Sequence, residues 1–248
     1  MSKNFKQSSD SNSSQLIIYG RHAVLAALTN PRRQIKKLLC TKETAPEIRA
    51  AKIQPQIVDR KEIDKLLPQD AVHQGFALFC NRLQNTPLED ILETSQTKDK
   101  CHVLILDQVT DPQNIGAIIR SAVAFNTLAL ILQDKNSPLE SGAMDKAAAG
   151  MIEHLPIVRV TNLSRAIEQL KDAGFWTVGM DGYAQTTIDK LNKSGKTAII
   201  MGSEGKGMRR LVEESCDISV KLPISPLTES LNVSTAAAIA LYEINKEE

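Results

Sequence analysis

TAIIMGSEGKGM, residues 197–208, joins a short apolar run to a glycine-rich loop. The run 197–201 predicts a buried β-strand. Three glycines within the next six residues predict a sharp turn or a close approach of the backbone to a ligand. A second apolar segment, 218–224, leads into SPLTESLNVS at 225–234, and we expect an alanine-rich helix to begin near Thr235. The sequence therefore predicts a ligand site, because ligands of α/β proteins bind where strands run into loops.

Two common nucleotide-binding loops do not fit this glycine pattern. A P-loop has glycine five residues before its Gly-Lys pair and Ser or Thr directly after it. Here Ile200 and Gly207 occupy those two positions. The dinucleotide-binding fingerprint reads Gly-x-Gly-x-x-Gly, whereas this loop reads Gly-x-x-Gly-x-Gly. The loop therefore belongs to another class of ligand site.

Three segments together resemble the signature motifs of the SpoU/TrmH family of RNA ribose methyltransferases. They are LILDQVTDPQNIGAIIRSA at 104–122, MGSEGKGM at 201–208 and LPISPLTESLNVSTAAAIALYE at 222–243, about a fifth of the chain. The resemblance implies 2′-O-methylation of an RNA ribose with S-adenosylmethionine as the cofactor. It also implies a homodimer and a C-terminal α/β domain with a trefoil knot, a feature that periodicity alone does not predict.

The chain has 248 residues, a length that can hold one large or two ordinary domains. Charge is distributed unevenly along it. Residues 1–84 carry 14 Lys and Arg against 7 Asp and Glu, whereas residues 85–248 carry 16 against 22. The basic first part predicts an anionic partner, with a solvated basic face that binds nothing as the alternative.

The composition favours a cytoplasmic protein. The sequence contains no run of 18 apolar residues, so a membrane span is not predicted. The serine-rich start lacks the apolar core of a secretory signal. The four cysteines form no CxxC pair, which favours free thiols over disulfides or a zinc site.

The first part of the chain is predicted to be a small α/β domain over 15–84, preceded by a disordered tail over 1–14. Apolar runs alternate there with helical patterns. Strands are expected at 35–40, 56–58 and 76–80, and helices at 23–28, 47–52 and 62–67.

YGRHAVLAAL at 19–28 and HQGFAL at 73–78 resemble the RNA-binding domain that precedes the catalytic domain in the family's ribosomal-RNA subgroup. In this domain we expect the RNA contacts to come from basic residues, namely Arg21, Arg32, Arg33, Lys36 and Lys37.

The second domain is predicted over 101–248, after a polar linker over 85–100. Six apolar runs alternate with about five helical patterns, which indicates an α/β domain with a largely parallel sheet. Strands are expected at 101–106, 128–132, 157–160, 176–180, 197–201 and 218–224, and helices at 113–125, 142–150 and 163–173 and near the C-terminus.

The resemblance assigns roles to individual residues of the three motifs. Cofactor binding is expected at Gly202, Leu222 and Leu231, with a simple turn and core leucines as the alternative. Catalysis and RNA contact are expected at Asn114, Arg120, Glu204, Ser230 and Asn232.

Some of these side chains have open alternatives. Asn114 follows Asp111-Pro112, where it could cap a helix or help to bind a phosphate, and we expect it to act from the preceding loop. Arg120 lies in an apolar helix and needs a partner, either an RNA phosphate or Glu204. Ser230 and Asn232 precede the last helix, where they could cap it or contact the cofactor and ribose.

Methyl transfer to a ribose hydroxyl needs alignment of the methyl donor with the oxygen and removal of the hydroxyl proton. The four histidines are isolated, so neither a catalytic triad nor a metal cluster is predicted. In the family, the equivalent of Arg120 is proposed to take the proton. Because a guanidinium is already protonated, we favour a phosphate relay in which Arg120 stabilises the developing alkoxide.

The resemblance thus implies 2′-O-methylation of a guanosine in large-subunit ribosomal RNA. The basic N-terminal domain favours this substrate, because the tRNA-modifying branch of the family typically lacks it. The alternatives are the same reaction on tRNA and a non-catalytic RNA- or ribosome-binding protein of the same fold.

Overall fold

The computed structural model describes residues 15–48, 53–192 and 194–246. Within these ranges the chain forms two compact units, and the boundary along the chain lies between Leu83 and Gln84. The disordered tail predicted for 1–14 lies outside the described residues, as does most of the helix predicted over 47–52.

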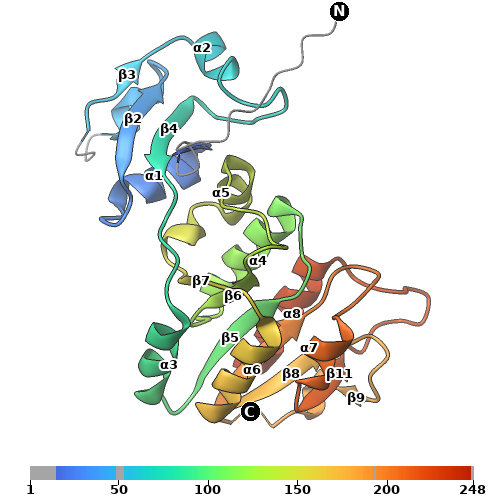
Figure 1. Cartoon of the computed structure of the whole chain (residues 1–248). Coiled ribbons are helices and arrows are strands. Elements are labelled where there is room, and N and C mark those ends of the chain that lie inside the picture. Colours follow the sequence, from blue (N-terminus) through green and yellow to red (C-terminus); the bar gives the residue numbers. More distant parts are fainter. Residues whose placement is uncertain (1–14, 49–52, 193, 247–248) are drawn as a thin grey trace, which may run out of the picture. The chain divides into compact units, whose positions relative to one another are not determined.

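The N-terminal unit is a small mixed sheet with short helices, and Figure 1 labels α1, β2, β3, α2 and β4. Its elements are β1 (Gln15–Tyr19), α1 (Arg21–Thr29), β2 (Ile35–Cys40), η1 (Ala45–Ile48), β3 (Gln56–Ile57), α2 (Arg60–Asp64) and β4 (Phe76–Asn81). The strand order is β1-β4-β2-β3, and only β2 and β3 run parallel. Phe76, Leu78 and Cys80 alternate along β4, so they share one face and pack with Ile18 and Leu38 in the core.

The C-terminal unit is built on a seven-stranded sheet of order β7-β6-β5-β10-β8-β11-β9, parallel throughout. Its strands are β5 (Cys101–Leu106), β6 (Leu130–Gln133), β7 (Ile157–Val160), β8 (Phe175–Met180), β9 (Thr186–Thr187), β10 (Lys196–Met201) and β11 (Ile218–Lys221). Its helices are α3 (Leu88–Gln96), α4 (Pro112–Ala124), α5 (Gly142–Ala148), η2 (Met151–Glu153), α6 (Leu163–Asp172), η3 (Ile188–Lys190), α7 (Arg210–Glu214) and α8 (Val233–Asn245).

Helices cover both faces of this sheet, which gives a three-layer α/β unit (Figure 1). Leu104 and Leu106 of β5 pack with α4, α5 and α8 on one face, while Val103 and Ile105 pack with α3, α6 and α7 on the other. β5 is therefore buried along its whole length, as expected for an inner strand of a parallel sheet.

The predicted fold class is confirmed, and the structure corrects several details. The predicted linker over 85–100 contains α3, whose Leu88 and Ile91 are buried against the sheet. The segment looked like a linker because only one narrow stripe of this short helix is apolar. The sequence patterns also missed α7 and the two-residue strand β9. None of the helices in the described ranges has the length and apolar character needed to cross a membrane.

A polar network ties β8 to the start of β11. The Asp217 carboxylate accepts hydrogen bonds from the backbone N–H and hydroxyl of Thr177, each at 2.8 Å, and lies 3.0 Å from Nζ of Lys171. Burial by itself raises the pKa of Asp217, but the bonds from Thr177 and the charge of Lys171 outweigh it, and the pKa is lowered.

Because the folded-state pKa of Asp217 is lower than its unfolded value, the network stabilises the fold at neutral pH and loses this contribution as the pH falls through that folded-state value. We expect Asp217→Asn to destabilise the protein at pH 7 and to remove this part of the acid sensitivity. Urea unfolding of both proteins across the acid range tests this. An equal stability difference at every pH would contradict the assignment.

Candidate functional site

The three sequence motifs meet at the carboxylate of Glu204. Its Oε1 accepts hydrogen bonds from Nδ2 of Asn232 at 2.8 Å, from Nδ2 of Asn114 at 3.3 Å and from the backbone N–H of Val233 at 3.1 Å. Nδ2 of Asn232 also donates to Oδ1 of Asn114 at 3.0 Å. Glu204 is 90 residues from Asn114 and 28 from Asn232, so tertiary structure brings them together. The glycine-rich turn and the Ser-Leu-Asn turn thus lie side by side.

Helix starts set the positions of both asparagines. Asn232 is the N-cap of α8, where its Oδ1 accepts from the backbone N–H two residues later. Asp111 is the N-cap of α4, accepting from the N–H of Gln113 at 3.0 Å. Asn114 lies in the first helical turn, so its predicted roles as a cap or as a loop residue are wrong. Its side-chain amide instead contacts Glu204 and Asn232.

Glu204 is carried by a tight hairpin that follows β10. Ser203 and Gly207 exchange two backbone hydrogen bonds, of 3.0 and 2.9 Å. A Cβ on Gly202 would lie 2.1 Å from the carbonyl carbon of Gly207 and 2.3 Å from the backbone nitrogen of Met208. Gly202 is therefore required by the close approach of the returning hairpin backbone, and this approach sets the position of Glu204.

The three predicted cofactor residues lie at the ends of elements beside this hairpin. Gly202 follows β10, Leu222 follows β11 and Leu231 precedes α8, and all three are half-buried. Within the described part of the chain, no hydrogen bond uses the backbone groups of Gly202 or Leu231. Apolar side chains beside unused backbone donors and acceptors suit an adenine ring. Binding of S-adenosylmethionine by these residues stays a prediction.

Arg120 and Ser230 stay outside the Glu204 network. Arg120 is exposed on α4, six residues after Asn114, and on an ideal helix the two side chains point to different sides. Neither an ion pair nor a hydrogen bond reaches the Arg120 side chain from the residues that the structure describes. The alternative of a structural pair with Glu204 is therefore wrong. Ser230 is exposed in the loop between β11 and α8.

The five predicted RNA contacts of the N-terminal unit differ in exposure. Lys36 and Lys37 are exposed on β2, and Arg32 is exposed in the turn before it. Arg21 forms an ion pair with Glu47 and stays half-exposed. Arg33 is buried, and its Nη1 donates to a backbone carbonyl of β4 at 3.0 Å, so it supports the fold and is removed from the set of RNA contacts.

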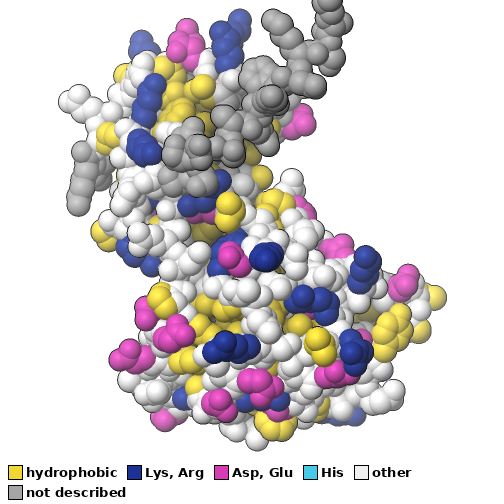
Figure 2. Space-filling view, viewed as in Figure 1, with side chains coloured by type: hydrophobic (Ala, Val, Ile, Leu, Met, Phe, Trp, Pro, Cys, Tyr) yellow, Lys and Arg dark blue, Asp and Glu magenta, His cyan; other side chains and the backbone are white. Residues whose placement is uncertain are grey.

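The surface agrees with the uneven charge of the chain. On the face shown in Figure 2, Lys and Arg side chains are spread over the N-terminal unit, and most Asp and Glu side chains lie over the C-terminal unit. The exposed residues Arg32, Lys36 and Lys37 are therefore the remaining strong candidates for RNA contact.

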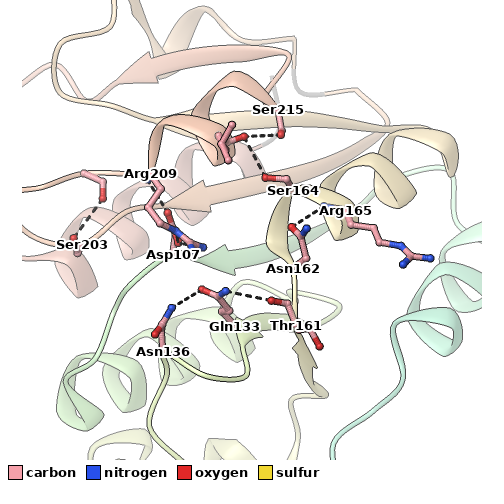
Figure 3. Close-up of polar contacts among 12 residues, drawn as sticks. Asp107, Gln133, Asn136, Thr161, Asn162, Ser164, Arg165, Ser203, Arg209 and Ser215 are labelled. Atoms are coloured by element: carbon pink, nitrogen blue, oxygen red, sulfur yellow. Dashed lines mark hydrogen bonds and ion pairs between the residues drawn. The ribbon is translucent and has the colours of Figure 1, made fainter.

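Sequence reasoning missed an ion pair beside the hairpin. The carboxylate of Asp107, fully buried at the end of β5, accepts from the backbone N–H and from Nε of Arg209, both at 2.8 Å. Figure 3 shows the Arg209 side chain reaching Asp107 from the segment that follows the hairpin. An acidic residue directly after an apolar strand was the available signal, because a charge at that depth needs a partner.

In the described ranges, no group of three or more His, Cys, Asp or Glu side chains could hold a metal ion. The polar groups that the fold does bring together are amides and a carboxylate, which position substrates and orient donors.

Profiles of two known families together match most of the chain. The profile of the SpoU rRNA methylase family matches residues 101–242. The profile described as RNA 2′-O ribose methyltransferase substrate binding matches residues 17–86. The two matches fall on the two units of the structure.

Individual proteins are also similar over nearly the whole chain. The 23S rRNA (guanosine-2′-O-)-methyltransferase RlmB of Pseudomonas aeruginosa is 37% identical over 93% of this chain and 96% of its own length. An uncharacterized tRNA/rRNA methyltransferase of Synechocystis, slr0955, is also 37% identical, but the chain spans only 62% of its length. The crystal structure of the SpoU methyltransferase AviRb from Streptomyces viridochromogenes has the same fold, with a TM-score of 0.79 at 20% identity, covering 94% of this chain and 90% of that one.

Proposed function

Because the chain belongs to the SpoU rRNA methylase family of RNA 2′-O-ribose methyltransferases, we propose that it methylates the 2′-hydroxyl of a guanosine in 23S ribosomal RNA. The methyl donor is S-adenosylmethionine. The observation that carries the proposal is the contact of Asn114, Glu204 and Asn232, in which residues of all three motifs share one carboxylate.

The choice of ribosomal RNA rests on the N-terminal unit. It carries the exposed basic residues Arg32, Lys36 and Lys37, and a phosphate backbone binds such a surface. The RlmB of Pseudomonas aeruginosa, whose name specifies a guanosine in 23S rRNA, is similar to this chain over both units. Methylation of tRNA is the main rival, since the Synechocystis relative is named for both substrates.

We assign a separate role in the reaction to each group of residues around the hairpin. The cofactor supplies an electrophilic methyl group. Gly202, Leu222 and Leu231 would hold its adenine end through backbone groups and apolar contact. Glu204 accepts hydrogen bonds from both asparagine amides, and through them it would orient Asn114 and Asn232 toward the ribose. Arg120 would bind an RNA phosphate and stabilise the alkoxide that forms when the ribose hydroxyl loses its proton.

Arg120→Lys tests this assignment. Lysine keeps the charge but loses the planar guanidinium, so we expect kcat to fall about tenfold or more, the loss expected when a charge-assisted hydrogen bond worth about 1.5–3 kcal/mol is removed. The matched control is Arg210→Lys, because the Arg210 side chain is 78% exposed on α7 and its ion pair with Glu214 lies on the same short helix. A variant of Arg120 that retained most of its turnover would argue against a specific arginine role.

The substrate can be identified directly. The purified protein is incubated with labelled S-adenosylmethionine and either 23S rRNA or total tRNA from a strain that lacks this gene. Methyl incorporation into 23S rRNA, mapped by mass spectrometry to a guanosine ribose, is the expected result. Methyl incorporation into tRNA alone would mean that the substrate is tRNA and not 23S rRNA. Calorimetry that detects no binding of S-adenosylmethionine would favour a non-catalytic RNA-binding protein.

We also propose that the protein is a homodimer and acts in the cytoplasm, where ribosomal RNA is assembled into ribosomal subunits. Ile239 and Tyr242 expose 41% and 55% of their surface on the outer side of α8, and the Tyr242 ring packs edge-on against Phe125 beside α4. A second copy would bury this apolar face. Sedimentation of the wild type and of Ile239→Lys decides this, since a purely monomeric wild type would contradict it.

A further inference from the structure

The strongest feature that the proposed reaction does not use is the ion pair between the buried Asp107 and the partly exposed Arg209. Asp107 has no exposed surface. Its Oδ1 lies 2.8 Å from Nε and 2.7 Å from Nη2 of Arg209, and its Oδ2 accepts from the backbone N–H of Arg209 at 2.8 Å. Both the side chain and the backbone of Arg209 are therefore fixed at one point.

The ion pair lies at the carboxyl ends of β5 and β10, where an α/β sheet of this kind usually binds its ligand. β5 and β10 are neighbours in the sheet, but the helices that follow them leave on opposite faces, α4 with one core cluster and α7 with the other. Ligands commonly bind between the carboxyl ends of two such strands. Here Asp107 follows β5 and Arg209 follows the hairpin after β10, so the ion pair occupies the crevice.

The pair connects two parts of the catalytic site. Asp107 lies seven residues before Asn114, and between them Gln108 adopts a left-handed φ of 60° that turns the chain toward α4. Arg209 lies five residues after Glu204, directly beyond the hairpin closed by Ser203 and Gly207. The hairpin is thus held at its tip by the Glu204 contacts and at its base by Asp107.

We propose that Asp107 and Arg209 are positioning residues that hold the hairpin so that Glu204 faces Asn114 and Asn232. A buried charge that loses its partner is strongly disfavoured, so the pair resists movement of the hairpin base. In Figure 3, Ser203 of the hairpin is drawn to the left of the Arg209–Asp107 contact. The inference rests on the proposed function, since it concerns the geometry of the same site.

The test uses Asp107→Asn and Arg209→Gln in the full-length protein. At a temperature well below unfolding, we expect kcat to fall about 10²-fold, the effect of a misplacement of roughly 1 Å. The matched control is Asp217→Asn, which breaks a separate carboxylate network of the same unit, between α6, β8 and the start of β11. This control is expected to lower the melting temperature while kcat stays close to wild type.

A double variant separates positioning from general destabilisation. If Asp107 acts through Glu204, the kcat of Asp107→Asn/Glu204→Ala should be close to that of Glu204→Ala alone. Multiplicative losses, or a kcat of Asp107→Asn no lower than that of the Asp217→Asn control, would overturn the inference.

Hydrogen exchange gives a readout that needs no activity. The N–H groups of Ser203 and Gly207 close the hairpin, and they should exchange faster in Asp107→Asn than in the wild type or in Asp217→Asn. A wild type that methylates no RNA would refute the proposed function, and these exchange rates would still decide the inference. Equal exchange in the three proteins would refute the positioning role.

Discussion

Gly202→Ala should slow methyl transfer by about 10²-fold or more and weaken S-adenosylmethionine binding. The new Cβ would lie 2.1 Å from the carbonyl carbon of Gly207, and neighbouring atoms do not approach that closely without a shift of the backbone. A return to ordinary contact requires the hairpin to move by more than 1 Å, a displacement that costs about 10²-fold or more in rate. Because Glu204 moves with the hairpin, both cofactor affinity and kcat should fall.

Gly182→Ala is the matched control for this experiment. An added Cβ at Gly182 meets no atom within 4 Å, and this glycine does not have a positive φ. Single-turnover methylation and calorimetry with S-adenosylmethionine should therefore give wild-type values for Gly182→Ala. Wild-type activity of Gly202→Ala would mean that the hairpin does not set the geometry of the site.

Glu204→Ala is expected to reduce kcat about as strongly, by about 10²-fold. The substitution removes the single oxygen that orders Asn114, Asn232 and the start of α8. Glu204→Gln keeps an oxygen that accepts the same bonds but removes the charge, and charge-assisted bonds are about twice as strong as neutral ones. We therefore expect the glutamine variant to retain more activity than the alanine variant.

Loss of the Glu204 side chain should leave the fold intact, because the residue is exposed. The matched control is Glu213→Ala, which removes an exposed carboxylate of α7 that has no hydrogen bond to the site in the described structure. Equal kcat values for Glu204→Ala and Glu213→Ala would contradict the role of Glu204. A sharp fall in the melting temperature of Glu204→Ala alone would assign Glu204 to folding rather than to catalysis.

Local patterns in the sequence were sufficient for most elements of the sheet. Apolar runs of four to six residues marked the inner strands β5, β6, β8 and β10, because inner strands of a parallel sheet are buried on both faces. A four-residue run also marked the edge strand β7. The two-residue β9 and the five-residue α7 were missed, since neither is long enough to show a period. α3 was taken as a linker because its apolar stripe is narrow.

The motifs also predicted which residues would matter, but not their contacts. The patterns placed Asn114, Glu204 and Asn232 near strand and helix ends, yet Glu204 was open to a pairing with Arg120 that the structure does not contain. Arg33 was counted as an RNA contact from its charge alone, whereas it is buried against β4. Charge in a sequence does not report burial.

The sequence by itself determined the α/β class, the order of most elements and the residue types available for methyl transfer, because each depends on local period and composition. Only the tertiary structure decided that β10 lies between β5 and β8. That strand order brings Asp107 to Arg209, 102 residues away, and Glu204 to Asn114, 90 residues away. Hydrophobic period records which face of an element is buried and carries no information about which strand lies beside it, so these contacts follow from the packing of the whole unit.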